Sequence, residues 1–194
     1  MKIKASDKKT KLLVTLAVLT AIVAILAYFG GFIKIGLASI SLTLVPVVLG
    51  AALCGPWSGA WLGFIAGAVF FLTPDAAFWL GMGILPTILI VLLKGFLAGL
   101  ASGYIYKLLE RVNKYLAVIV SAIICPVVNT SIFLIGCRLF FWDFVTSSAS
   151  GSGKSVLGFI IVSLVSINFV FELLVNIVLS PSILKLLNLA RKSN

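Results

Sequence analysis

The sequence predicts an all-α polytopic membrane protein, a single domain over residues 1–194 that forms a bundle of six transmembrane helices. Its composition and its long apolar runs carry this prediction. The chain is 62% hydrophobic and 10% charged, with a mean hydropathy of +1.26. Soluble domains average about 45–50% apolar and about 25% charged residues. A chain of 194 residues also leaves little room for a catalytic domain beside six membrane spans.

Six apolar runs divide the chain, and they cover residues 12–29, 40–54, 57–72, 84–108, 115–141 and 156–187. The second and third runs are short, because a membrane-crossing helix needs about 20 residues. Only Cys54-Gly55-Pro56-Trp57 separates them, and this stretch indicates a tight turn between two helices. Merging the two runs into one span gives a five-span alternative. The basic start resembles a signal peptide, but the length of the first run and the lack of a small-residue cleavage site favour a retained helix.

The basic residues predict that both termini are cytoplasmic. In this orientation the N-terminal segment, the connection between the fourth and fifth runs and the C-terminal segment hold most of the lysines and arginines inside. The outer side receives only Lys34, Arg138 and Lys154. This asymmetry follows the positive-inside rule and requires an even number of spans. Basic residues that flank apolar runs also indicate contact with lipid headgroups, and the net charge of +10 therefore does not indicate binding to nucleic acid.

Three segments are expected to be external loops: the glycine-rich residues 30–40, residues 73–83, and the small, polar residues 142–155. Trp79 and Trp142 fall in the last two. Each tryptophan is open to two interpretations, anchoring at the membrane interface or stacking on a ligand.

Small residues recur every four positions in two runs, which places each series on one helix face. The series are Gly55, Gly59, Gly63, Gly67 and Gly95, Gly99, Gly103. Because lipid offers little hydrophobic drive between helices, such stripes predict close packing of the third and fourth helices. The first helix carries a shorter version, Ala17 and Ala21. These alanines serve either internal packing or docking of a helix from another protein.

Polar side chains at bilayer depth usually mark function or a specific pairing. Asn168, Glu172 and Asn176 share one face of the sixth helix, Asn129 and Thr130 lie in the outer half of the fifth, and Lys94 lies about 15 Å down the fourth. We expect these helices to form one cavity that opens outward. The candidate substrate-binding residues are Lys94, Asn129, Thr130, Asn168 and Glu172, with Trp79 and Lys34 from the external loops.

Two other interpretations of this cluster stay open. One is a buried Lys94–Glu172 pair that serves only helix packing, and the other is a proton relay through Glu172. The sequence gives little support for acid–base catalysis, because such catalysis often uses two carboxylates and we expect Glu172 to be the only acid deep in the membrane.

The residue inventory gives no basis for a metal site, a cofactor or an enzymatic activity. The chain has no histidine, and its three cysteines form no CxxC pair. Ser148–Ser155 resembles the end of a P-loop, but serine stands at position 148 where the motif requires glycine, and no strand precedes it. We therefore expect no nucleotide site in this chain.

The layout resembles the substrate-binding S component of energy-coupling factor (ECF) vitamin transporters over nearly the whole chain. The resemblance includes the basic N-terminus and the order of several stretches along the six runs. These stretches are Ala17-x-x-x-Ala21, Ser41-Leu-Thr-Leu-Val-Pro46-Val-Val-Leu-Gly50-Ala, Gly55-Pro56-Trp57-Ser-Gly59-Ala, Lys94-Gly95-Phe-Leu-Ala-Gly99 and Pro126-Val-Val-Asn129-Thr130.

The resemblance implies a subunit of a prokaryotic cell membrane that binds a water-soluble vitamin or related micronutrient from outside. Helices 4–6 and the external loops would line the site. A transmembrane T subunit and two cytosolic ATPases would drive toppling of the subunit and substrate release, with Ala17 and Ala21 as the docking surface for the T subunit.

Val45-Pro46 and Val128-Asn129-Thr130 look most like pantothenate-type members, although the histidine that such members often carry beside the proline is absent. The alternative function is a stand-alone secondary transporter or channel. That class favours internal repeats, and the sequence contains no convincing inverted pair.

Overall fold

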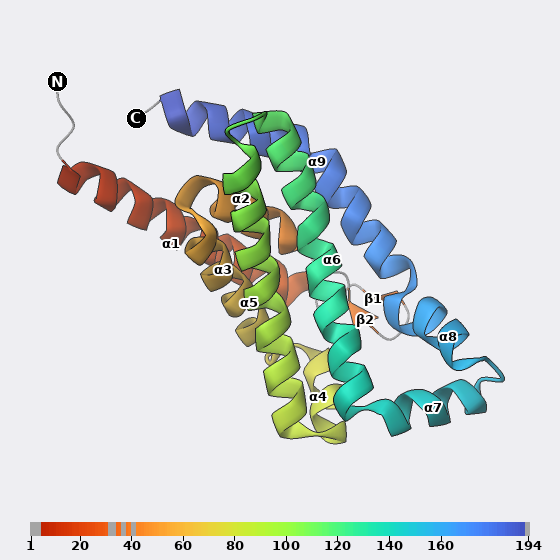
Figure 1. Cartoon of the computed structure of the whole chain (residues 1–194). Coiled ribbons are helices and arrows are strands. Elements are labelled where there is room, and N and C mark those ends of the chain that lie inside the picture. Colours follow the sequence, from red (N-terminus) through yellow and green to blue (C-terminus); the bar gives the residue numbers. More distant parts are fainter. Residues whose placement is uncertain (1–4, 31–33, 36–37, 40–41, 193–194) are drawn as a thin grey trace.

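The computed structural model describes residues 5–30, 34–35, 38–39 and 42–192 (Figure 1). Nearly all of them are helical, and the helices are α1 (Ala5–Gly30), α2 (Leu44–Cys54), α3 (Pro56–Phe70), α4 (Pro74–Met82), α5 (Ile84–Leu109), α6 (Lys114–Phe140), α7 (Trp142–Gly151), α8 (Val156–Phe159), the π-helical segment η1 (Ile160–Val165) and α9 (Ser166–Lys192). Two-residue strands β1 (Lys34–Ile35) and β2 (Ala38–Ser39) pair antiparallel, with Lys34 opposite Ser39.

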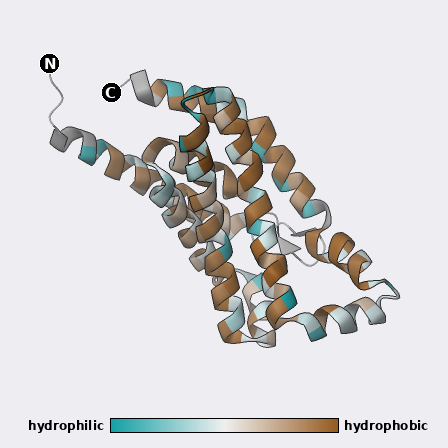
Figure 2. Ribbon diagram, in the orientation of Figure 1, coloured by the Kyte–Doolittle hydropathy of each residue, from teal (hydrophilic) through white to brown (hydrophobic). Residues whose placement is uncertain are grey.

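Four helices are long and apolar enough to cross a membrane, and they are α1, α5, α6 and α9. Figure 2 shows that hydrophobic residues cover most of the length of these helices. Up to six spans result if each of two bent helix pairs counts as one span. The prediction of an all-α polytopic membrane protein is therefore confirmed, whereas six spans and the N-in/C-in orientation stay predictions.

The loop expected over residues 73–83 is wrong, because α4 occupies most of it and bends by 85° from α3. Thr73-Pro74-Asp75 explains the helix. Proline at the first position has the required φ and lacks only an N–H that would have no helical partner, and the Asp75 carboxylate interacts favourably with the positive helix N-terminus.

The loop expected over residues 142–155 is also mostly helical, because α7 extends to Gly151. Its small polar residues remain in the helix by hydrogen-bonding to the preceding turn. The Ser147 hydroxyl donates to the Asp143 carbonyl at 2.7 Å, and the Thr146 hydroxyl donates to the Trp142 carbonyl at 3.1 Å. The chain then bends by 98° between α7 and the α8–η1 segment.

The glycine stripes bring the backbones of α3 and α5 into direct contact, as the sequence predicts. A Cβ at Gly63 would overlap the Gly95 carbonyl, and one at Gly59 would lie 2.6 Å from the Gly99 carbonyl oxygen. Since only glycine fits at these crossings, α3 determines where α5 lies. Lys94, the neighbour of Gly95, is thereby placed at a defined depth and direction.

The basic ends of the chain and the connecting helices α4 and α7 lie at opposite ends of the molecule. The start of α1, the turn between α5 and α6 and the end of α9 lie toward one end, whereas α4 and α7 lie at the other (Figure 1). Buried hydrophobic residues form two clusters, one around Val47, Leu62 and Val118 and the other around Trp79 and Phe141. The cavity described next takes wall residues from both clusters.

Candidate functional site: a cavity inside the helix bundle

A cavity lies inside the bundle, and α1–α6, η1 and α9 all contribute to its wall. Its accessible volume is about 140 Å³. One water molecule needs about 10–15 Å³ on this measure, so the space is large enough for about ten waters or for a small organic molecule. Its polar wall residues are Thr43, Thr73, Asp75, Thr87, Lys94, Asn129, Thr130, Asn168 and Glu172.

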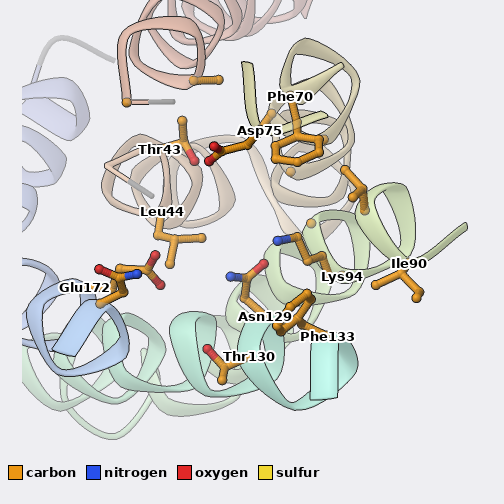
Figure 3. Close-up of a pocket in the computed structure, with 18 of the residues that line it drawn as sticks. Thr43, Leu44, Phe70, Asp75, Ile90, Lys94, Asn129, Thr130, Phe133 and Glu172 are labelled. Carbon is orange, nitrogen blue, oxygen red and sulfur yellow. The ribbon is translucent and has the colours of Figure 1, made fainter. Parts of the chain in front are cut away.

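Lys94 enters the cavity from α5, beside the glycine contact with α3 (Figure 3). Its Nζ lies 5.3 Å from the centre of the Phe133 ring and 6.0 Å from that of Phe70. The negative faces of aromatic rings attract an ammonium ion at such distances. No ion pair of Lys94 occurs among the residues that the structure describes, so the Lys94–Glu172 pair considered above does not form as a direct contact.

The amides and hydroxyl predicted on the last two spans reach the same cavity. Asn129 and Thr130 come from α6, and Asn168 and Glu172 come from α9. Asn129 and Glu172 are only 8% and 6% exposed, respectively. The structure therefore brings together all five polar residues that the sequence singles out on the last three long helices.

Asn176 shares a helix face with Asn168 and Glu172 but has another role. Its Nδ2 donates to the backbone carbonyl of Glu172 at 2.8 Å, and its backbone carbonyl accepts from the Ser180 hydroxyl at 2.8 Å. These bonds run along α9 inside the bundle. Asn176 thus belongs to the helix below the cavity, one turn beyond the last polar wall residue that α9 contributes.

Asp75 is a second acid in the cavity wall, in addition to Glu172. Its side chain is 5% exposed and points into the cavity from α4 (Figure 3). The signal in the sequence was the helix-start pattern Thr73-Pro74-Asp75. A loop over residues 73–83 gives no reason to place this carboxylate within the bundle, whereas α4 brings it into the cavity wall.

Trp79 closes the α4 side of the cavity as part of an aromatic wall. Its ring centre lies 5.3 Å from that of Phe133 and 5.9 Å from that of Phe141. The Thr87 hydroxyl donates to the Trp79 carbonyl at 2.8 Å and ties α4 to α5. With 6% exposure, Trp79 faces the interior, which favours the ligand-stacking interpretation over interface anchoring.

The remaining candidates lie away from this wall. Trp142 packs beneath the Arg138 guanidinium, whose central carbon lies 4.1 Å from the ring centre. The Lys34 side chain lies outside the described residues, although its backbone forms β1. Ala17 and Ala21 are exposed on α1.

This architecture defines a class of protein, a polytopic α-helical membrane protein with a cavity inside its bundle that polar and charged side chains line. The family model for the substrate-specific component of ECF transporters matches residues 11–184. The chain belongs to this family and is a transport subunit rather than an enzyme. No curated protein and no solved structure matches the chain.

Proposed function

We propose that this subunit captures a water-soluble vitamin or related micronutrient outside the cell and delivers it by associating with a T subunit and two cytosolic ATPases. The observation that carries the proposal is the wall of the cavity. Lys94, Asn129 and Asp75 enter one cavity beside the Trp79 ring. Burying such groups in a membrane protein is costly, and a scaffold without a polar ligand has no need of them.

The proposed orientation has the cavity loading from outside and both termini in the cytoplasm of a prokaryotic cell. The shared location of the three basic segments supports it, because the basic ends of α1 and α9 and the basic α5–α6 turn lie toward the same end of the molecule (Figure 1). By the positive-inside rule this end is cytoplasmic. The end that carries α4 and α7 then faces outward.

The proposed docking surface for the T subunit is the outer face of α1 around Ala17 and Ala21. Both alanines are exposed, and the neighbouring Val18 is 54% exposed. Exposed small residues one turn apart allow a second helix to approach closely in lipid. This position supports the docking interpretation over internal packing, since neither alanine is covered by another element.

Among the vitamins, pantothenate is our first candidate substrate. The polar stretch around Asn129 and Thr130, on which the resemblance to pantothenate-type members partly rests, lies in the cavity wall. Pantothenate is also small and carries both a carboxylate and hydroxyl groups, for which the cavity offers an ammonium group and hydrogen-bond acceptors.

Binding and uptake together test the proposed function. Purified protein should bind one vitamin with submicromolar affinity, measured by isothermal titration calorimetry. Cells should take up that vitamin only when the T subunit and ATPases are co-expressed. Uptake by the chain alone, driven by an ion gradient, would instead establish the stand-alone transporter, and the ATP-driven assembly would be rejected.

A further inference from the structure

The cavity has two poles of opposite charge on different elements. Lys94 and Asn129 enter from α5 and α6, and Asp75 enters from α4 on another wall (Figure 3). Glu172 stands on a third wall, on α9. Because α4 is tied to α5 through the Thr87–Trp79 hydrogen bond, the first two poles keep a defined separation.

The Lys94 pole lacks an anion in direct contact. Its ammonium group interacts with the Phe70 and Phe133 rings, and in the described part of the chain no carboxylate lies within ion-pair distance of it. Aromatic rings compensate a cation for only part of the hydration that it loses on burial. The buried ammonium group is therefore stabilised further by an anion in contact with it. The Asn129 amide beside it offers two further N–H donors for the same anion.

The Asp75 pole offers acceptors instead of donors. A carboxylate has about four acceptor positions, so it can accept from a ligand in addition to a partner within the protein. The cavity therefore presents acceptors at α4 and donors at α5 and α6. A simple cation could not contact Lys94, and a neutral molecule would leave the ammonium group without an anion in direct contact.

We propose, on the basis of the proposed function, that the substrate is a small carboxylic acid with hydrogen-bond donors at its other end. The carboxylate contacts Lys94 Nζ and the Asn129 amide. The donor end, made of hydroxyl or amine groups, contacts Asp75. Lys94 and Asp75 are thus the two residues that determine specificity, and Trp79 covers the part of the molecule between them.

Matched acid and neutral probes test the acid end. The probes are pantothenate with pantothenol and biotin with biotinamide, whose far ends carry hydroxyl and N–H donors respectively, and thiamine serves as a cationic probe. Binding to the purified protein is followed by the melting temperature and by calorimetry. At least one acid should bind, and its neutral partner should bind at least about tenfold more weakly, since a hydrogen bond to a charged group contributes about 1.5–3 kcal/mol.

Two substitutions test the residues with the acid that binds. Lys94→Met and Asp75→Asn should each weaken its binding by about tenfold or more. The matched controls are Lys154→Met, an exposed lysine before α8, and Asp143→Asn, an exposed aspartate in the first turn of α7. Both controls should bind as the wild type does.

The melting temperature of the ligand-free variants separates a binding role from a structural one. Lys94→Met should melt no lower than the wild type, because it removes a charge that lacks a counter-ion. A fall in the melting temperature with unchanged affinity would make Lys94 a packing residue and overturn the proposal. Equal binding of a neutral partner or of thiamine would overturn it while the transport function stands. Failure of every probe to bind would count against both.

Discussion

Asn129 illustrates how a single side chain contributes to recognition in this cavity. It lies on α6 one turn above Pro126, it is 8% exposed, and its amide points into the space that Lys94 also enters (Figure 3). An amide both donates and accepts, so it suits a ligand that carries either kind of group. The Asn129 amide is therefore expected to contribute to the free energy of ligand binding.

The Asn129→Ala variant should weaken vitamin binding by about tenfold, because a buried ligand group then loses its hydrogen-bond partner at a cost of about 1–3 kcal/mol. Calorimetry on the purified protein measures the effect. The control is Asn113→Ala, which removes the cap of α6, whose Oδ1 accepts from the N–H groups of Tyr115 and Leu116. It should cost about 1 kcal/mol of stability without changing affinity. Unchanged affinity in Asn129→Ala would remove this residue from the site.

At the scale of elements, the α3–α5 contact is the feature that positions the site. The two backbones meet at Gly63 and Gly95, one residue from Lys94. Contacts this close give helices in lipid much of their association energy. The α4 helix adds a second constraint, since its bend from α3 brings Asp75 and Trp79 over the α5–α6 pair.

Gly63→Ala should destabilise the protein by about 1–3 kcal/mol or more, because its new methyl group would overlap the Gly95 carbonyl and force α3 and α5 apart. The shift of α5 should also weaken vitamin binding through Lys94. Thermal unfolding in detergent and calorimetry measure the two effects.

The control for this change is Gly81→Ala in α4, where an added Cβ meets nothing within 4 Å. It should leave stability unchanged or raise it by about 0.5–1 kcal/mol, since alanine favours a helix over glycine. Equal melting temperatures for Gly63→Ala and the wild type would show that the contact relaxes easily and does not position α5.

At the scale of the whole molecule, most of the length of α1 is exposed, whereas α5, α6 and α9 pack into the bundle more fully. A helix with so little cover within its own subunit suits contact with a partner. Association and binding then use separate surfaces, because α1 lines the cavity only at its C-terminal end, with Leu26, Ala27 and Gly30.

Ala17→Leu and Ala21→Leu should abolish vitamin uptake in cells that co-express the T subunit and ATPases, because the added side chain prevents close helix approach. Vitamin binding to the purified variant should stay normal. Ala77→Leu, at an exposed alanine on α4, is the control for added bulk and should support uptake. Loss of binding in the α1 variants would mean that these alanines stabilise the fold instead.

Cysteine labelling tests the orientation. Val112, which is 80% exposed in the α5–α6 turn, should label as Val112→Cys only after the cells are permeabilised. Leu72→Cys and Ser152→Cys, on the other side, should react with an impermeant maleimide on intact cells. The wild type gives the background of the native cysteines, of which Cys125 and Cys137 are buried. The reverse pattern would contradict the proposed topology, and labelling of Val112→Cys and Leu72→Cys on one side would mean that α5 does not cross the membrane.

Local residue patterns sufficed for part of the fold and site. The long apolar runs predicted α1, α5, α6 and α9, because hydropathy over 20 residues depends on composition alone. The spacing of Asn168 and Glu172 predicted a shared face, because helix periodicity is local. The polar composition of residues 142–155 failed to predict α7, because hydroxyl bonds to the preceding turn keep such residues helical.

The sequence by itself determined the membrane class, the close approach of the glycine-bearing helices and five polar residues of the cavity. The tertiary structure alone decided that Asp75 belongs to the same cavity, that Trp79 faces the interior, and that the Lys94 ammonium group faces aromatic rings instead of pairing with Glu172. The physical reason is that charge pairing and enclosure depend on distances between elements. Those distances depend on how α3, α4 and α5 pack, and residue spacing along one helix contains no information about them.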